Sequence, residues 1–169
     1  MKKVIIAATF LTFSISMTAC GLVDKGSLKK ITEGQEFNAW EMDLVEKLES
    51  YGLEDNEKER LQKIDAECDD IGDNDYKNQL LIAKKLVKLT SQIESRIETS
   101  AKKLVEKLDN TDVPYASEDE KEKLTEYSEK ISEMIKKHNF INYKEVSENW
   151  SKLVEYSSTK LTGLDVNIV

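Results

Sequence analysis

Apolar residues recur at helical spacing over most of the chain, from about residue 36 to residue 161. No stretch alternates apolar and polar residues for long enough to favour a β-strand. The chain has one proline, Pro114, so little in the sequence interrupts long helices. The pattern therefore predicts an all-α fold, an elongated antiparallel helical bundle with coiled-coil-like seams and about five helices, one of them long and central.

Helix start and stop signals divide this pattern. Gly52 ends the first helix, Asn56 with Glu59 forms a variant capping box for the second, and Ser117 with Glu120 forms one for the fourth. Within the second helix, Leu61, Ile64, Cys68 and Ile71 are spaced as in a coiled-coil seam. The predicted helices cover about residues 36–51, 56–71, 76–108, 117–138 and 142–162.

The third predicted helix is unusually long. At 1.5 Å per residue it would extend about 50 Å, which is too long for one compact neighbour to cover. We therefore expect the other helices to lie along it in series. Its predicted buried stripe consists of Tyr76, Leu80, Ala83, Val87, Thr90, Ile93, Ile97, Ala101, Leu104 and Leu108.

The start of the chain has the features of a secretory signal: a cationic start, an apolar core and small residues before a cysteine. These are Lys2 and Lys3, residues 4–15, and the sequence Met17-Thr18-Ala19-Cys20. The segment resembles the bacterial lipoprotein class, whose lipobox ends in cysteine, although Met17 stands where leucine is usual. The resemblance covers only the first 21 or so residues, and it implies cleavage between Ala19 and Cys20 and a lipid on Cys20.

Two other interpretations of this segment are a transmembrane anchor and an ordinary secretory cut. The apolar run is interrupted by threonines and serines and is short against the roughly 20 apolar residues that a membrane span needs. The expected organisation is a signal peptide over 1–19, a flexible tether over 20–35 with several glycines, a helical bundle over 36–163 and a C-terminal tail over 164–169. The expected location is the extracytoplasmic face of the cell membrane, in a bacterium that the lysine-rich, arginine-poor composition suggests is Gram-positive.

The net charge of the chain is −8, and loss of Lys2 and Lys3 with the signal peptide makes it more negative by two. This sign disfavours nucleic acid and anionic lipid headgroups as partners. With Cys20 acylated, Cys68 stands alone and no internal disulfide forms. The bundle is therefore expected to hold by packing.

The sequence contains no recognisable catalytic constellation. His138 is the single histidine, at the end of a predicted helix, and Cys68 is in a seam, where cysteine behaves as a small hydrophobe. The acidic stretch 69–75 does not match a calcium loop, because Gly72 falls at the wrong place and the closing glutamate is missing. No glycine-rich phosphate loop, CxxC or HExxH occurs. We expect no catalytic residue, no metal site and no cofactor.

Three aromatic residues lie off the predicted seams and are candidate partner contacts: Tyr115, Phe140 and Tyr156. The expected function is a lipid-anchored, non-catalytic interaction or structural module of the cell envelope that contacts another envelope or extracellular protein. The alternative is a lipid-anchored protein that binds a metal or a small solute.

Overall fold

The computed structural model describes residues 25–109, 113 and 115–159, which form six α-helices and, in those ranges, no strand. The predicted all-α fold is confirmed. None of the helices in the described ranges is both long and apolar enough to cross a membrane. The helices are α1 (Lys25–Ile31), α2 (Phe37–Ser50), α3 (Asp55–Cys68), α4 (Tyr76–Asp109), α5 (Glu118–Lys137) and α6 (Tyr143–Thr159).

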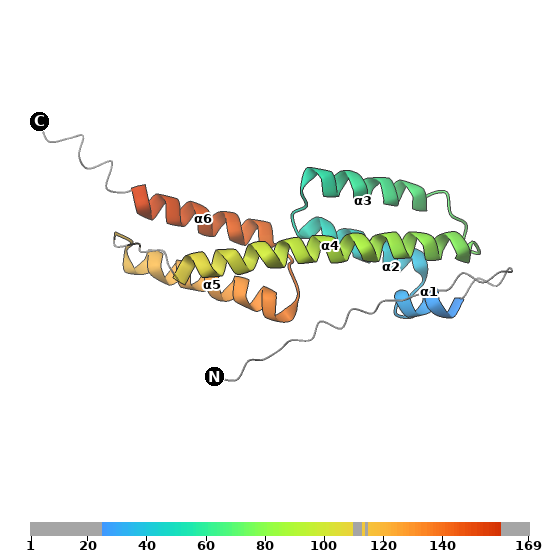
Figure 1. The fold of residues 1–169 in the computed structure, drawn as a ribbon, viewed down its shortest axis with the longest axis horizontal. Coiled ribbons are helices and arrows are strands. Elements are labelled where there is room, and N and C mark those ends of the chain that lie inside the picture. The colour runs from blue at the N-terminus through green and yellow to red at the C-terminus, as the bar shows by residue number, and fades with distance from the viewer. Residues whose placement is uncertain (1–24, 110–112, 114, 160–169) are drawn as a thin grey trace, which may run out of the picture.

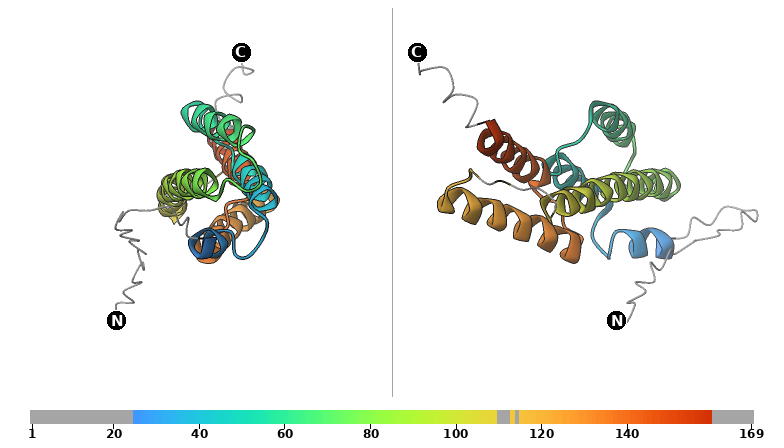
Figure 2. Two further views of the ribbon diagram at one scale, coloured as in Figure 1. Left: turned by 90° about the vertical axis from the view of Figure 1, so that its right-hand side faces the viewer. Right: turned by 60° about the vertical axis from the view of Figure 1, so that its left-hand side comes forward.

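Helix α4 is the spine of the molecule. Its 34 residues extend about 50 Å, and the other helices lie along it in two groups (Figure 1). Helices α1, α2 and α3 flank its first half, and α5 and α6 flank its second half (Figure 2). We call these groups the N-terminal half and the C-terminal half of the rod. The expected arrangement in series along one long helix is thus observed.

The buried face of α4 differs from the predicted stripe in the first half of the helix. Ile93, Ile97 and Ala101 are buried as predicted, whereas Val87 is 47% exposed and Leu86 and Leu89 are buried instead. Helices α1 and α3 both contact α4 and lie on different sides of it (Figure 2). Three neighbouring helices therefore define a wider buried face there than a single seam would.

Residues 25–35 form a helix and a turn, so the predicted flexible tether over 20–35 is wrong for this part. Leu28 and Thr32 are buried, and Ile31 packs against the core. The helix ends where Glu33 and Gly34 take positive φ angles of 54° and 85°. Burial of one apolar face against α4 stabilises this short helix. The predicted signal peptide and the start of the tether lie outside the described residues, as does the predicted C-terminal tail.

The termini of the predicted helices follow the sequence signals closely except in α3, which ends at Cys68, three residues before the predicted end. The Ser117 hydroxyl accepts from the Glu120 N–H at 3.3 Å, and the Glu120 carboxylate accepts from the Ser117 N–H at 2.7 Å, which confirms this capping box. Helix α3, however, begins earlier than predicted, with Glu54 and Glu57 as its reciprocal capping pair. The side chain of Glu57 is held in place by an arginine of α4, described below.

The two halves of the rod meet where α2 ends and α5 turns into α6. The rings of Tyr51 and Phe140 stack edge to face with centroids 5.9 Å apart, and both side chains are fully buried. The Asn142 N–H donates to the Ser50 carbonyl at 3.0 Å. Gly52, at φ +77°, approaches Lys144 so closely that a Cβ there would lie 2.3 Å from the Lys144 Cβ. We call this contact region the junction.

Candidate functional site

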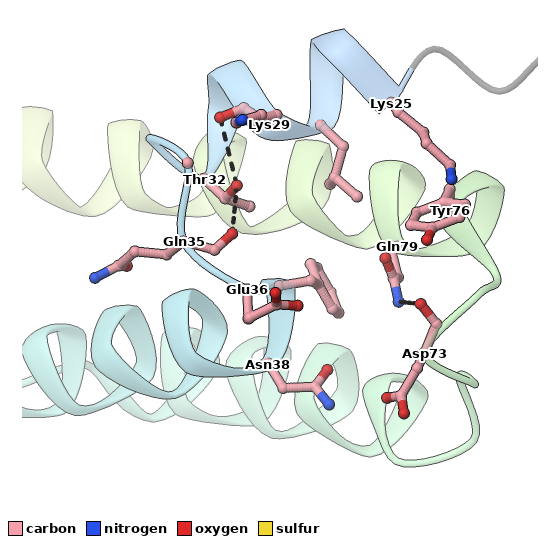
Figure 3. Close-up of a pocket in the computed structure, with 12 residues that line it drawn as sticks. Lys25, Lys29, Thr32, Gln35, Glu36, Asn38, Asp73, Tyr76 and Gln79 are labelled. Atoms are coloured by element: carbon pink, nitrogen blue, oxygen red, sulfur yellow. Dashed lines mark hydrogen bonds between the residues drawn. The ribbon is translucent and has the colours of Figure 1, made fainter.

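A pocket of about 340 Å³ opens at the corner where α1, the start of α2 and the start of α4 meet (Figure 3). One of its walls is α1, the helix that forms within the predicted tether. Two lysines, Lys25 and Lys29, come from α1, and two carboxylates, Glu36 and Asp73, come from the facing loops. Its other lining residues are Leu28, Thr32, Gly34, Gln35, Phe37, Asn38, Tyr76 and Gln79.

The polar groups of this corner pocket mostly hold the surrounding loops. The Gln79 amide donates to the carbonyls of Gly72 and Asp73, each at 3.2 Å, and the Thr32 hydroxyl donates to the Gln35 carbonyl at 3.1 Å (Figure 3). The Lys25 ammonium lies 4.0 Å from the centre of the Tyr76 ring, a cation–π distance. The pocket can accept a small polar or anionic group, but its described lining residues include no nucleophile beside a base.

A second polar cluster lies at the junction and centres on Glu94 of α4. One Glu94 oxygen accepts from the Tyr51 hydroxyl at 3.1 Å and lies 3.7 Å from the Lys47 ammonium. The other lies 3.2 Å from His138 Nε2, and His138 Nδ1 lies 3.7 Å from Glu98. His138 is the left-handed C-cap residue of α5, with φ 50°. One carboxylate therefore collects side chains from α2 and from the end of α5.

A third cluster connects α3 to α4. The Arg96 guanidinium donates to both oxygens of Glu57 at 2.7 and 2.6 Å, and its third nitrogen lies 3.4 Å from Glu54. Burial opposes ionisation of Glu57, but the Arg96 fork and the Glu54 N–H outweigh it and lower the pKa of this carboxyl. The bidentate geometry is the strong form of an ion pair.

The most unusual group is Glu41, an acid on the buried side of α2. It is 6% exposed, and its Oε1 has no hydrogen-bond partner among the described residues. Burial, followed by the nearby Asp65 carboxylate of α3, raises its pKa to about 7. Burial and the Glu41 charge likewise raise the pKa of the Cys68 thiol to about 12. Cys68 is therefore a protonated thiol at neutral pH, which makes it a poor nucleophile.

The three candidate contact residues differ in their exposure to solvent. Tyr115 is 53% exposed and Tyr156 is 56% exposed. Phe140 is fully buried against Tyr51, so it cannot contact a partner, and its prediction was wrong. A turn between helices was expected to leave Phe140 at the surface, but the end of α2 covers it. Cys20 and the cleavage position after Ala19 lie outside the described residues.

The sequence reasoning missed Glu41 and Glu57, although a signal for both was present. Each occupies a helical position in line with apolar core residues: Glu41 follows Phe37 by four, and Glu57 precedes Leu61 by four. An acid at such a position predicts either a shifted pKa or a buried ion pair. Glu94 carried no such signal, because its partners come from distant segments.

Among the described residues, no group of three or more His, Cys, Asp or Glu side chains is arranged to hold a metal ion. In the acidic stretch before α4, the Asp75 carboxylate accepts a hydrogen bond from the Asn78 backbone N–H at 3.2 Å, at the start of the helix. No protein-family model, curated protein or solved structure matches this chain.

Proposed function

We propose that this protein is a lipid-anchored, non-catalytic interaction module on the extracytoplasmic face of a bacterial cell membrane. The observation that carries the proposal is the lipobox-like sequence ending in Cys20, which stands five residues before α1. Behind it lies a rod of helices with a continuous spine. Such an architecture suits the display of a binding surface near a membrane.

The anchor would be close to the rod. Five residues span at most about 17 Å when fully extended, so Cys20 lies within that distance of the start of α1. Each buried methylene contributes about 0.8 kcal/mol, and a single acyl chain binds only marginally whereas two hold stably. A diacylated Cys20 would therefore fix the N-terminal half of the rod at the bilayer.

The partner surface would lie at the opposite end of the rod. Tyr115 precedes α5 and Tyr156 lies in the last turns of α6, and both of these segments are at the end of α4 that is far from α1 (Figure 1). Exposed tyrosines are enriched in the energetic centres of protein interfaces. The proposed partner is therefore another envelope or extracellular protein that contacts this end.

Mass spectrometry of the protein from membrane fractions tests the anchor. We expect an N-terminal peptide that begins at an acylated Cys20, and no acylated peptide from the Cys20→Ser variant. An N-terminus without lipid would refute the proposed anchor. Photo-crosslinking side chains at positions 115 and 156 test the partner, with the exposed position 62 on α3 as the control. Recovery of the same products from all three positions would argue against a specific surface.

The corner pocket favours a second candidate, binding of a small anionic solute between Lys25 and Lys29. Its volume is at the lower end of the range for ligand sites. A thermal-shift screen with small carboxylates and phosphates separates the two candidates. A shift that Lys29→Ala abolishes would support solute binding, and no shift with any compound would reject it.

A further inference from the structure

The charge of the N-terminal half is divided between its two sides. Helix α1 carries three lysines and no acid, and residues 76–93 of α4 carry four lysines and no acid. Helix α2 instead carries four acids and one lysine, and α3 carries five acids and three basic residues. Viewed along the rod, α1 and α4 lie on one side and α2 and α3 on the other (Figure 2, left). The negative net charge of the chain conceals this division.

The lysines of α4 form a regular row on its exposed face. Lys77, Leu81, Lys84 and Lys88 follow one another at spacings of four, three and four residues, and all four side chains are exposed. Residues at such spacings share one side of a helix, and this row extends about 17 Å. Lys85 is not part of this row; it points toward α3, where it pairs with Glu67. The Asp75 carboxylate, at the start of the row, accepts a hydrogen bond from the side-chain amide of Asn78.

Large apolar side chains accompany these lysines. Leu81 is 52% exposed within the row, and Val87 is 47% exposed beside it. Binding at a membrane interface combines attraction of lysines to anionic lipids with burial of apolar side chains among the headgroups. A purely solvated face does not need the apolar residues. The row therefore has both parts of an interfacial surface.

We propose that this face of α4, with the lysines of the adjoining α1, docks on anionic phospholipid headgroups. The proposal rests on the proposed lipid anchor, which would hold α1 within a short distance of the bilayer. Charge and position both support the proposal, because the cationic side of the N-terminal half is the side that contains α1, the helix nearest Cys20 in the sequence. The anionic side formed by α2 and α3 would face away from the membrane. The rod then lies along the membrane surface.

Lysine labelling of the lipidated protein in vesicles tests this orientation. The protein is reconstituted in phosphatidylcholine alone or with phosphatidylglycerol, and its lysines are acetylated and quantified by mass spectrometry. We expect labelling of Lys77, Lys84 and Lys88 to fall several-fold in the anionic vesicles only. Lys58 and Lys63, exposed on α3 on the side that would face away from the membrane, serve as internal controls. Equal labelling of the row in both vesicles would overturn the proposal.

A second measurement tests whether this face binds membranes in the absence of the lipid anchor. The chain from residue 20 with Cys20→Ser contains the six helices that the structure describes but cannot be acylated at that position. Its binding to the same vesicles is measured by co-sedimentation. Each lysine near an anionic surface raises the binding affinity roughly fivefold. Lys84→Glu with Lys88→Glu should therefore reduce vesicle binding at least tenfold. The matched reversal Lys58→Glu with Lys63→Glu on α3 should change it less than threefold. Circular dichroism checks that both variants remain folded.

The outcomes of the two measurements are distinct. An unlipidated Cys20 with intact vesicle binding would refute the anchor but not the basic face. A lipidated Cys20 with no preference for anionic vesicles would refute the face but not the anchor. Labelling protection by soluble polyphosphate equal to that by vesicles would assign the face to anionic polymers and overturn the lipid proposal. Binding that persists unchanged at high salt would also contradict it, since salt screens such contacts.

Discussion

Glu41 is a carboxylic acid on the buried side of α2, and it makes the stability of the protein depend on pH. Its pKa in the folded protein is about 7, against an ordinary value of 4.5. Between these values the folded protein retains a proton that the unfolded chain has released. The contribution of Glu41 to the free energy of unfolding therefore falls as pH rises through this window and is lowest above it.

Glu41→Gln should remove this decline. The neutral amide needs no proton to remain buried, so we expect the variant to be more stable than the native protein at pH 8, by about 1–3 kcal/mol, and close to it at pH 4. Urea unfolding at both pH values measures the difference. Glu46→Gln, an exposed change on the same helix, is the control and should have little effect. Parallel curves for Glu41→Gln and the native protein would contradict the assignment.

At the scale of the helices, α3 is held at its start by one arginine. Arg96 of α4 reaches Glu57 with two hydrogen bonds, and Glu57 also accepts from the Glu54 N–H at 2.9 Å to complete the capping box. The ion pair therefore fixes the helix terminus and its position on α4 together. Because the pKa of Glu57 is lowered, this contribution is present above the ordinary value and is lost as pH falls.

Arg96→Lys tests this attachment. Lysine keeps the charge but not the planar fork, so we expect a loss of about 1–2 kcal/mol at pH 7. The further loss of stability on acidification should be smaller than in the native protein. Arg60→Lys is the matched control, since Arg60 makes a single exposed hydrogen bond to Gln92. Equal effects of the two substitutions on the urea midpoint would show that the fork has no special role.

The helices that were predicted well are those with their own signals. The bounds of α2 and α4 agree with the prediction to within a residue or so, because Gly52 and the stretch 72–75 mark them. Helix α1 was missed because the glycines and the serine of residues 20–35 indicated a linker, and its stability comes from Leu28 against α4. Phe140 was misplaced for the same reason: its burial depends on Tyr51, which is distant in sequence. Local signals determined the helix bounds, whereas contacts between distant segments determined the formation of α1 and the burial of Phe140.

At the scale of the whole molecule, the junction decides whether the two halves form one unit. Three glycines provide a graded test. Gly34 and Gly52 both have positive φ angles, but only at Gly52 does a Cβ meet the opposite half of the rod, whereas a Cβ at Gly72 meets nothing within 4 Å. Strain and steric conflict can therefore be measured separately.

We expect Gly72→Ala to change stability little, Gly34→Ala to cost about 1–2 kcal/mol, and Gly52→Ala to cost about 2–4 kcal/mol. Hydrogen exchange should show that Gly52→Ala also weakens protection at the end of α2 and the start of α6, which Gly34→Ala should leave unchanged. A Gly52→Ala protein as stable as Gly34→Ala would mean that the halves move apart at no cost, and the junction would then be a hinge.

A rod that lies along the membrane also places its far end near the bilayer. Tyr115 and Tyr156 would then meet a partner that is itself held at the membrane surface rather than one in the outer wall. This consequence couples the two proposals, because reversal of Lys84 and Lys88 should alter which proteins crosslink at those tyrosines.

The chain has a single histidine, and its ring lies between the Glu94 and Glu98 carboxylates beside Phe140. Its two carbon-bound ring protons therefore give magnetic resonance signals that no other imidazole overlaps. Those signals supply an intrinsic reporter, without any label, for events at either end of the molecule that reach its middle.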